Sequence, residues 1–429
     1  MSYSWHDPER LLAGAQPSEN SLFAADVRRR RTQSVTITRR DPFDELMDPE
    51  HLITVFRWQK AIGGLGAGSD GVRYEDVSIA EAGTTFRQLS RAIHHRTYRP
   101  QPARQVEIPK PDGGTRVLSI RSIFDRAIAR AVVEFLTPAA EAILLDGCHG
   151  CRPARGVWTL LADLVHAVNA GFTTVGQADV RRAFDTVPVD RAIAAFAAVT
   201  PDDKFCWLVE TLLRGAEGAN RRVGLDQGCP MSPMALNLLL NDALDRPLNE
   251  AAAGSNIRWF RYVDNYYVTA TCTTQSQYAL GHIRTLLQTT NMSTKPNSEH
   301  VTNLRRNGTR APVLGFELHG TPPRVQLHRA AFTALAEALD PAHTGPNPAA
   351  TGEAVVRGWL TAAGPGLGET EREAVLERVR REVRESGLRE SLQHAQVADA
   401  AEKAYASWRR VLEERVPRET NPQGHAPLY

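Results

Sequence analysis

Apolar and polar positions follow two different periods along the chain, and the period separates predicted helices from predicted strands. Within residues 42–96, Leu52, Val55, Phe56 and Ile62 recur near helical spacing. The same reasoning predicts further helices at 123–145, 190–213, 234–248 and 278–289. Runs rich in β-branched and aromatic residues predict strands at 173–180, 257–270 and 311–320. This order of elements is typical of an α+β fold with helices layered on one sheet.

A hairpin and a helical C-terminal region complete the pattern. Two β-type runs in residues 104–120 flank Pro111-Asp112-Gly113-Gly114, which is a strong turn sequence. After Pro322 the pattern is almost wholly helical, and Val375, Val379 and Val383 recur every four residues opposite Glu and Arg. We therefore predict five segments, with boundaries at 1–45, 46–172, 173–325, 326–417 and 418–429.

Charge and composition narrow the class of protein only slightly. The 51 Lys and Arg residues nearly balance the 49 Asp and Glu residues. The run Arg28-Arg29-Arg30-Arg31 is either a solvated segment or an arm that contacts nucleic acid. Five scattered cysteines favour a reducing compartment. No apolar run approaches the ~20 residues that cross a bilayer, and the N-terminus has charges where a signal peptide is apolar. We expect a cytoplasmic protein without a membrane partner.

Two acidic positions follow predicted strands and are the strongest chemical signal. Asp179 ends one β-run, and Asp264 lies beside Asn265 with apolar residues on both sides. A lone buried aspartate is more often structural than a ligand. Two on adjacent strands would repel each other unless a cation lay between them. Hard divalent ions prefer such oxygen ligands, and a pair of them supports in-line phosphoryl transfer.

These motifs resemble those of reverse transcriptases. The first, second and third palm motifs of that family are similar to ADVRRAFDTV (178–187), GLDQGCPMSPMALNLLLNDALD (224–245) and RYVDNYYV (261–268). The fingers, later palm and thumb of the group II intron-type enzymes are similar to residues 98–132, GCHGCRPARGV, VLGFELHG and VVRGWLTAAG. The resemblance spans roughly residues 45–365. It implies a right-hand polymerase with fingers at 46–172, a palm with an antiparallel sheet at 173–325, and a helical thumb at 326–417, between a basic arm and a tail.

The resemblance also implies a role for individual residues. Asp179 and Asp264 would be catalytic and would bind Mg²⁺, or alternatively Mn²⁺, with the Val180 carbonyl as a further ligand. Asn265 would complete the catalytic turn. The implied nucleotide-binding residues are the triphosphate clamps Lys110 and Arg116, the steric gate Phe184 and the nucleotide and template contact Gln227. Phe184 could equally pack in the core, and either cation could be a surface residue. Tyr262 would lie near the primer end. Lys295 would protonate pyrophosphate, unless MSTKPNSEHV is simply a loop.

Three residues depart from the family pattern. Asn265 replaces the second aspartate of the turn, Cys229 replaces a serine, and Asp226 stands where proline is usual. The amide oxygen of Asn265 could still bind a metal, but it carries no charge. The formal negative charges therefore fall from three to two, and we expect weaker binding of one ion.

Several functions remain open at this point. The first is an active reverse transcriptase that copies RNA into DNA from deoxynucleoside triphosphates. The second is an inactive scaffold that binds RNA or a partner polymerase. Retention of both the clamp and the gate favours the enzyme. The others are template-independent or protein-primed synthesis, and an intron maturase lacking its endonuclease. Ser232-Pro233 is retained and retron motifs are absent, so the chain resembles the bacterial "unknown group" enzymes of phage defence. That resemblance implies a cognate noncoding RNA, with a homo-oligomer or a partner protein as further options.

Overall fold

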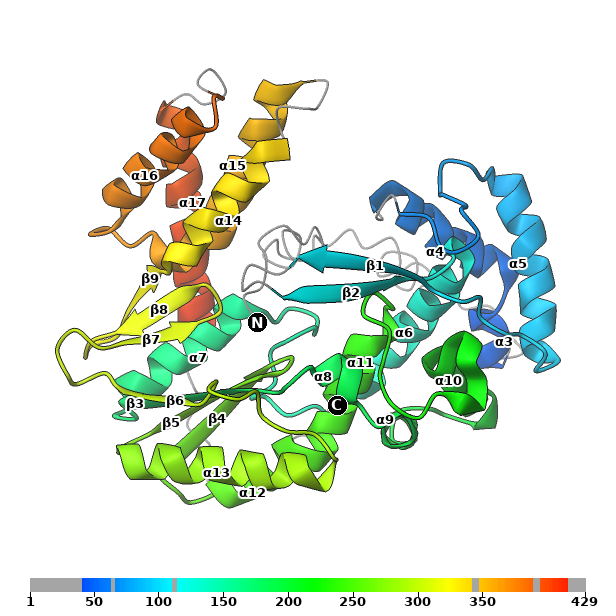
Figure 1. Cartoon of the computed structure of the whole chain (residues 1–429), viewed down its shortest axis with the longest axis horizontal. Helices are drawn as coiled ribbons and strands as arrows, with labels where there is room; N and C mark the ends of the chain where they lie inside the picture. Colours follow the sequence, from blue (N-terminus) through cyan, green and yellow to red (C-terminus); the bar gives the residue numbers. More distant parts are fainter. Residues whose placement is uncertain (1–40, 63–65, 110–113, 342–346, 389–393, 416–429) are drawn as a thin grey trace, which may run out of the picture.

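The computed structural model describes residues 41–62, 66–109, 114–341, 347–388 and 394–415 (Figure 1). Its first part combines helices with one hairpin. The elements are α3 (Pro42–Leu46), α4 (Pro49–Ile62), α5 (Ile79–His94), β1 (Arg104–Pro109), β2 (Thr115–Ile120), α6 (Ile123–Ile143) and α7 (Val157–Asn169). β1 and β2 are antiparallel, with Arg104 opposite Ile120, so the predicted hairpin is confirmed. The predicted long helix is also confirmed, and the Ser122 hydroxyl caps its first turn.

A four-stranded antiparallel sheet lies at the centre of the molecule. Its strand order is β4 (Ile257–Tyr262), β5 (Asn265–Ala270), β3 (Thr174–Asp179) and β6 (His300–Asn303). Figure 1 shows α12 (Arg246–Ala252) and α13 (Thr273–Thr289) below this sheet and α7 above it. The central strands β3 and β5 are buried along nearly their whole length, although β3 contains polar residues as well as apolar ones.

One region predicted as a single helix is divided, and another is continuous but changes its helical type. Residues 190–213 form α9 (Val189–Phe196) and α10 (Asp203–Arg214), because Pro201 interrupts the helical pattern and Asp202 caps a new helix. Residues 234–248 lie in one continuous helical stretch, which consists of α11 (Met231–Leu240), a π-helical turn (Asn241–Asp245) and α12. The short elements between β3 and α11 are α8 (Ala183–Thr186) and a 3₁₀ helix (Gly215–Asn220).

Two predicted strands are in fact hairpins. The run 311–320 was predicted as one strand, but β7 (Arg310–Val313) and β8 (Phe316–His319) turn at Leu314 and Gly315, both with positive φ. β9 (Arg324–Leu327) completes this second, three-stranded sheet. The run 257–270 likewise divides into β4 and β5 at Val263, whose φ is 56°. Leucine and valine rarely adopt this conformation, so Leu314 and Val263 do not indicate a turn by residue type, although Gly315 does.

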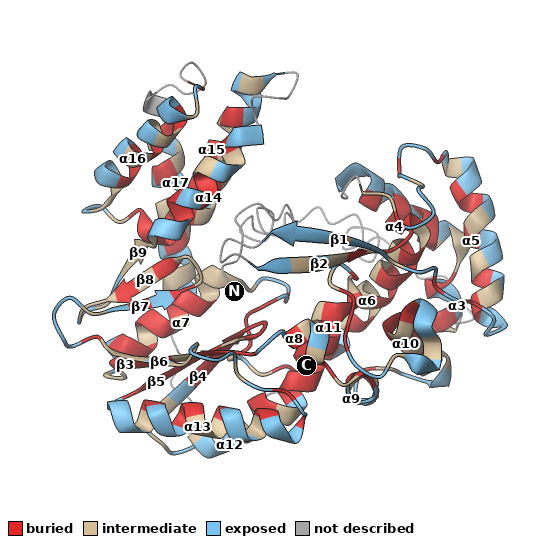
Figure 2. Cartoon of the chain, in the orientation of Figure 1, coloured by how far each residue is buried: buried red, intermediate tan, exposed pale blue. Residues whose placement is uncertain are grey.

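The C-terminal region is helical, as predicted. It contains α14 (Arg329–Leu339), α15 (Pro348–Ala363), a 3₁₀ turn (Gly364–Gly366), α16 (Arg372–Glu385) and α17 (His394–Glu414). These helices share a second hydrophobic core, which includes Val375, Val379 and Val383. Figure 2 shows buried positions along α14, α15 and α16. The α+β class is thereby confirmed. None of the helices in the described part of the chain combines the length and apolar character that a bilayer crossing needs.

Candidate active site

Two buried carboxylates meet at one end of the central sheet. Asp179 is the last residue of β3 and lies opposite Asn265, the first residue of β5. Asp264 occupies the turn between β4 and β5 and is fully buried. The Val180 amide donates a hydrogen bond to the Asp264 carbonyl over 2.9 Å, which fixes this turn against the end of β3. Carboxylates 85 positions apart in the sequence are thus neighbours in the fold.

A buried ion pair supports the turn that holds Asp264. Arg261 and Asp245 are both completely buried, and Arg261 Nε lies 3.0 Å from Asp245 Oδ1. Burial alone would lower the pKa of Arg261, but the Asp245 carboxylate raises this pKa above its usual value. Arg261 Nη1 also donates to the Val263 carbonyl over 3.0 Å. The guanidinium therefore stabilises the strained residue immediately before Asp264.

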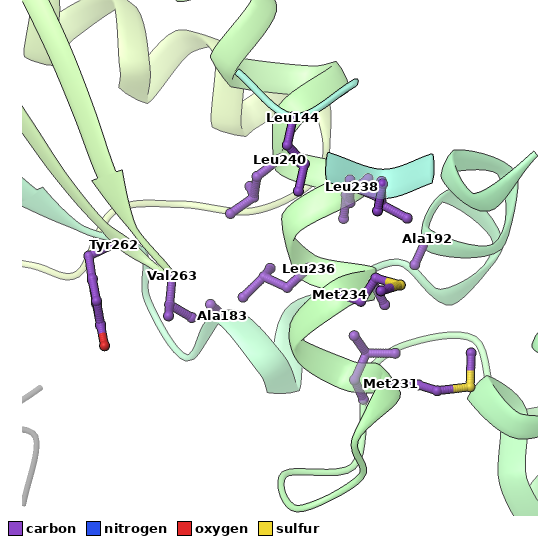
Figure 3. Close-up of a cluster of buried hydrophobic side chains, with 14 of the residues drawn as sticks. Leu144, Ala183, Ala192, Met231, Met234, Leu236, Leu238, Leu240, Tyr262 and Val263 are labelled. Atoms are coloured by element: carbon purple, nitrogen blue, oxygen red, sulfur yellow. The ribbon is translucent and has the colours of Figure 1, made fainter. Parts of the chain in front are cut away.

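The apolar side of this turn packs on helices. Figure 3 shows Val263 directed toward Ala183 and Leu236, whereas the Tyr262 ring points away from that cluster. Tyr262, predicted to lie near a primer end, is only 7% exposed.

The segment GCHG of the fingers-like motif lies along the outer edge of β4. Arg261 donates its amide to the Gly147 carbonyl over 2.7 Å, and its carbonyl accepts from His149 over 2.8 Å. A Cβ at Gly150 would lie 2.3 Å from the Val263 nitrogen, so only glycine fits there. This motif therefore braces the turn from the side opposite Asp179.

Asn265 makes a contact that an ionised aspartate could not make. Its Nδ2 donates to Asp264 Oδ1 over 3.2 Å. The carboxylate only accepts hydrogen bonds, so the amide nitrogen must face it. Asn265 is consequently a hydrogen-bond donor to the buried aspartate, a role that the sequence comparison with Asp-Asp turns did not suggest.

Two nucleotide-binding candidates, Gln227 and Phe184, lie in or contact the loop before α11, and a third, Arg116, lies on the hairpin that this loop contacts. The Gln227 carbonyl accepts from the Ser119 amide of β2 over 2.6 Å. Phe184 on α8 is half-buried, and its carbonyl accepts from the Leu225 amide over 2.7 Å. Arg116 lies on β2 opposite Ile108 and is half-buried. Lys110 lies outside the described residues.

Asp226 forms a buried ion-pair cluster that the sequence did not reveal. Arg121 Nε approaches its Oδ2 within 2.9 Å, and Arg221 Nη2 approaches its Oδ1 within 2.6 Å. Burial would raise the pKa of Asp226, but the two guanidinium groups hold it below the usual value. The cluster joins the end of β2 to the loop that carries Gln227. Arg121 is 105 positions away in the sequence, so no local pattern indicates the pairing.

A cavity of about 780 Å³ opens beside the carboxylates, between the central sheet, the β7–β8 hairpin and α14. Asp179, Asn265 and Lys295 line it, and the Lys295 amide donates to the Asp179 carbonyl over 2.7 Å. Lys295 lies in a loop after α13. Tyr267 also lines the cavity, and burial, with a smaller contribution from Asp179, raises its pKa well above the usual value. Tyr267 therefore remains a neutral phenol beside the carboxylates.

The donor set fits a hard divalent ion. Asp179 and Asp264 offer carboxylate oxygens, and Val180 adds a main-chain carbonyl at the same strand end. Mg²⁺ prefers oxygen ligands and uses few protein carboxylates, with substrate phosphates and water completing the shell. Among the described residues, no group of three or more His, Cys, Asp and Glu side chains surrounds one point. The protein thus supplies a partial shell of the kind that a bound triphosphate completes.

Comparison with known proteins finds a family model that matches the central region of the chain. A family model described as "Reverse transcriptase (RNA-dependent DNA polymerase)" matches residues 108–318. This match and the arrangement of elements confirm the expected right-hand polymerase fold. The match contains β2, the central sheet and both carboxylates.

Individual relatives match over part of their length. The chain is 28% identical over 145 residues to "Uncharacterized 91 kDa protein in cob intron" of Schizosaccharomyces pombe, covering 33% of this chain and 18% of that protein. It is 29% identical over 177 residues to "Protein YkfC" of Escherichia coli, covering 39% and 46%. The chain thus spans less than half the length of these relatives. A solved structure of telomerase from Candida albicans is similar with a TM-score of 0.47 and 11% identity, covering 74% of this chain and 59% of that one.

Proposed function

We propose, from the premise that residues 108–318 belong to the reverse transcriptase family, that this protein is an RNA-directed DNA polymerase. The observation that carries the proposal is the meeting of Asp179 and Asp264 at one end of the sheet, beside the loop that holds Gln227. Such a pair suits the transfer of a nucleotidyl group to a primer 3′-hydroxyl, with pyrophosphate as the leaving group.

Individual residues of the chain would have separate roles in this reaction. When bound, divalent ions would neutralise phosphate charge and lower the pKa of the attacking hydroxyl. Asp179, Asp264 and the Val180 carbonyl would hold those ions. Arg116, with Lys110, would bind the triphosphate and offset the charge that develops on it. Lys295, exposed in the cavity beside Asp179, would be the proton donor to pyrophosphate.

The full-length purified protein tests this function directly. With Mg²⁺, labelled dTTP and oligo(dT) on poly(rA), we expect incorporation into the primer, and Mn²⁺ should substitute. Because the natural template is not specified by these observations, RNA that co-purifies with the protein should be assayed as well. Complete lack of incorporation with both metals and both templates would refute the enzyme function and favour a nucleic-acid-binding scaffold.

Phe184→Ala is expected to relax discrimination against ribonucleotides by roughly 10- to 100-fold, because a bulky ring next to the sugar would clash with a 2′-hydroxyl. The measurement is the ratio of kcat/KM for dTTP and UTP on the same primer. Phe184→Tyr keeps the ring and serves as the control, with discrimination close to wild type. An unchanged ratio in Phe184→Ala would instead assign Phe184 to core packing alone.

Asn265→Asp is expected to preserve or raise incorporation. The substitution adds a third carboxylate beside Asp179 and Asp264, so the half-saturating Mg²⁺ concentration should fall by about 2- to 10-fold. A metal titration of initial rates measures this shift. A complete loss of activity would show that the hydrogen bond from Asn265 to Asp264 is required for catalysis.

The finer biological role belongs to the same proposal. We infer a bacterial enzyme that works with a cognate noncoding RNA in defence against phage, by elimination of the retron and diversity-generating enzymes and by analogy with standalone bacterial reverse transcriptases. Sequencing of the bound nucleic acid separates this role from intron splicing: a discrete noncoding RNA supports it, and intron RNA contradicts it.

A further inference from the structure

The helix α17 packs into both hydrophobic cores of the molecule. Its first half contributes Val397, Ala401 and Ala404 to the core that it shares with α14, α15 and α16. Trp408, one turn further along, belongs instead to the core that contains the central sheet. Figure 1 shows α17 running from α15 and α16 toward α7, which lies above that sheet. One helix therefore joins the C-terminal helices to the part of the chain that holds the two carboxylates.

Aromatic packing and a hydrogen bond hold the second half of α17 on α7. The rings of Trp158 and Trp408 meet edge to face, with their centroids 6.3 Å apart. Trp158 Nε1 also donates to the Ala362 carbonyl of α15 over 3.1 Å. One turn beyond Trp408, the Leu412 carbonyl accepts from His166 Nε2 over 2.8 Å. Two successive turns of α17 are thus anchored on α7.

An ion pair closes this contact just beyond the end of α17. Arg415 Nε donates to Asp163 Oδ1 over 2.9 Å, and Arg415 Nη2 donates to Asp163 Oδ2. The Arg415 and Asp163 side chains are 25% and 14% exposed, so solvent screens this pair less than it screens a surface pair. Burial would raise the pKa of Asp163, but the contacts with His149 and Arg415 hold this pKa below its usual value. Asp163 therefore offers Arg415 a full negative charge at neutral pH.

The position of the C-terminal helices determines the width of the cavity beside the carboxylates. Asp179 and Asn265 line the cavity from the central sheet, whereas Ala330 and Thr333 of α14 and Arg378 of α16 line it from the C-terminal helices. The chain enters α14 directly from β9, and a single covalent link of this kind permits rotation about a hinge. α17 connects the same helices to α7 at a second place, and two separated connections oppose that rotation.

We propose that α17 is a strap, closed by the pair of Arg415 with Asp163, which holds α14 and α16 at a fixed distance from the central sheet and thereby retains a primer–template between successive additions. Release of the strap allows α14 to move away from the sheet, so the cavity widens and a bound duplex dissociates sooner. The retention of a primer–template rests on the proposed polymerase function, whereas the fixed position of the helices does not.

A distance across the cavity tests the strap without any nucleic acid. Donor and acceptor dyes are attached to azidophenylalanine in place of Tyr278 on α13 and Glu385 on α16, which are both exposed. We expect one narrow distribution of distances in the otherwise wild-type protein and a distribution at least about twofold broader in Arg415→Met. Arg409→Met breaks an exposed pair with Glu413 on the same helix, and it should leave the distribution narrow. Equal distributions for Arg415→Met and the wild type would overturn the strap.

The length of the products from one binding event measures retention on oligo(dT)·poly(rA). Labelled primer–template is bound first, and dTTP is then added with an excess of unlabelled primer–template that captures any released enzyme. Arg415→Met and Asp163→Asn should each shorten the mean extension by about three- to tenfold. The rate of the first addition should remain within about twofold of wild type, because neither variant alters the two carboxylates. The double variant should be no worse than either single one, since each already removes the same pair.

Asp163→Asn separates the strap from a direct contact between Arg415 and nucleic acid, because it leaves the positive charge of Arg415 in place. A defect confined to Arg415→Met would overturn the strap in favour of a phosphate contact. Broader distances in both variants of a protein that incorporates nothing would support the strap and refute the polymerase function. Normal incorporation with unchanged distances and unchanged product lengths would refute the strap and leave the polymerase function intact.

Discussion

Asp264→Asn and Asp179→Asn are each expected to reduce nucleotide incorporation by about 10³-fold or more. Each substitution removes one of the two paired carboxylates at the end of the central sheet, and the neighbouring Asn265 cannot replace the charge. Loss of a metal-binding charge removes stabilisation where negative charge develops, and each 1.36 kcal/mol of barrier is about tenfold in rate. Single-turnover incorporation of dTTP in saturating Mg²⁺ measures the effect.

Two controls test whether the loss of incorporation is specific to these two aspartates and to catalysis. Asp203→Asn changes an aspartate whose side chain is 93% exposed on α10, and it should leave the rate unchanged. Primer–template affinity of Asp179→Asn and Asp264→Asn should remain close to wild type, because neither residue is a cation that contacts phosphate. Retention of more than about a tenth of the wild-type rate in either variant would exclude that aspartate as a metal ligand.

The meeting of these carboxylates could be predicted from the sequence for a physical reason. One predicted strand ends in Asp179, and another β-type run contains Asp264. The residue types of each run indicate that it is a strand, and antiparallel pairing of the two strands brings Asp179 close to Asp264. The same local signal explains the success of the β1–β2 hairpin, whose strands flank a Pro-Asp-Gly-Gly turn. The strands and the turn depend on residues close in the chain, which a pattern can detect, whereas the pairing of β3 with β5 was expected only from their membership of one sheet.

The supports of the site depend on residues far apart, and the pattern did not reveal them. Asp226 meets Arg121 across 105 positions, and Asp245 meets Arg261 inside the core. The residue type alone does not distinguish a buried ionised side chain from an exposed one. The contact of Asp163 on α7 with Arg415, just beyond α17, is likewise invisible in either helix alone. Asn265 shows a different limit, since it is adjacent to Asp264 in the sequence and yet its donation to Asp264 could be found only from the geometry.

Turns at residues that rarely adopt a positive φ form a second limit. The sequence divides residues 104–120 correctly because proline and glycine mark the turn. It fails to divide residues 311–320 because Leu314, with φ of 45°, occupies a conformation that leucine seldom adopts. Tertiary packing fixes such a residue, so the information lies in the contacts of the β7–β8 hairpin with the rest of the fold.

Arg261→Met is expected to lower the free energy of unfolding by about 3–5 kcal/mol, the usual cost of leaving one charge of a buried pair without its partner. Asp245 would remain fully buried, with the Tyr266 hydroxyl still donating to it over 2.9 Å. Urea unfolding followed by tryptophan fluorescence measures the loss. Arg258→Met, an exposed arginine on the same strand, is the control and should cost about 1 kcal/mol or less.

A second substitution distinguishes the lost charge pair from lost packing. In Arg261→Met/Asp245→Leu no charge is left buried, so part of the lost stability should return relative to Arg261→Met alone. Catalysis should not return with it, because the hydrogen bond from Arg261 to the Val263 carbonyl is missing in both variants. Recovery of stability without recovery of incorporation would show that Arg261 both stabilises the core and fixes the turn of Asp264. Recovery of both would confine Arg261 to stability, since the turn would then hold Asp264 correctly without it.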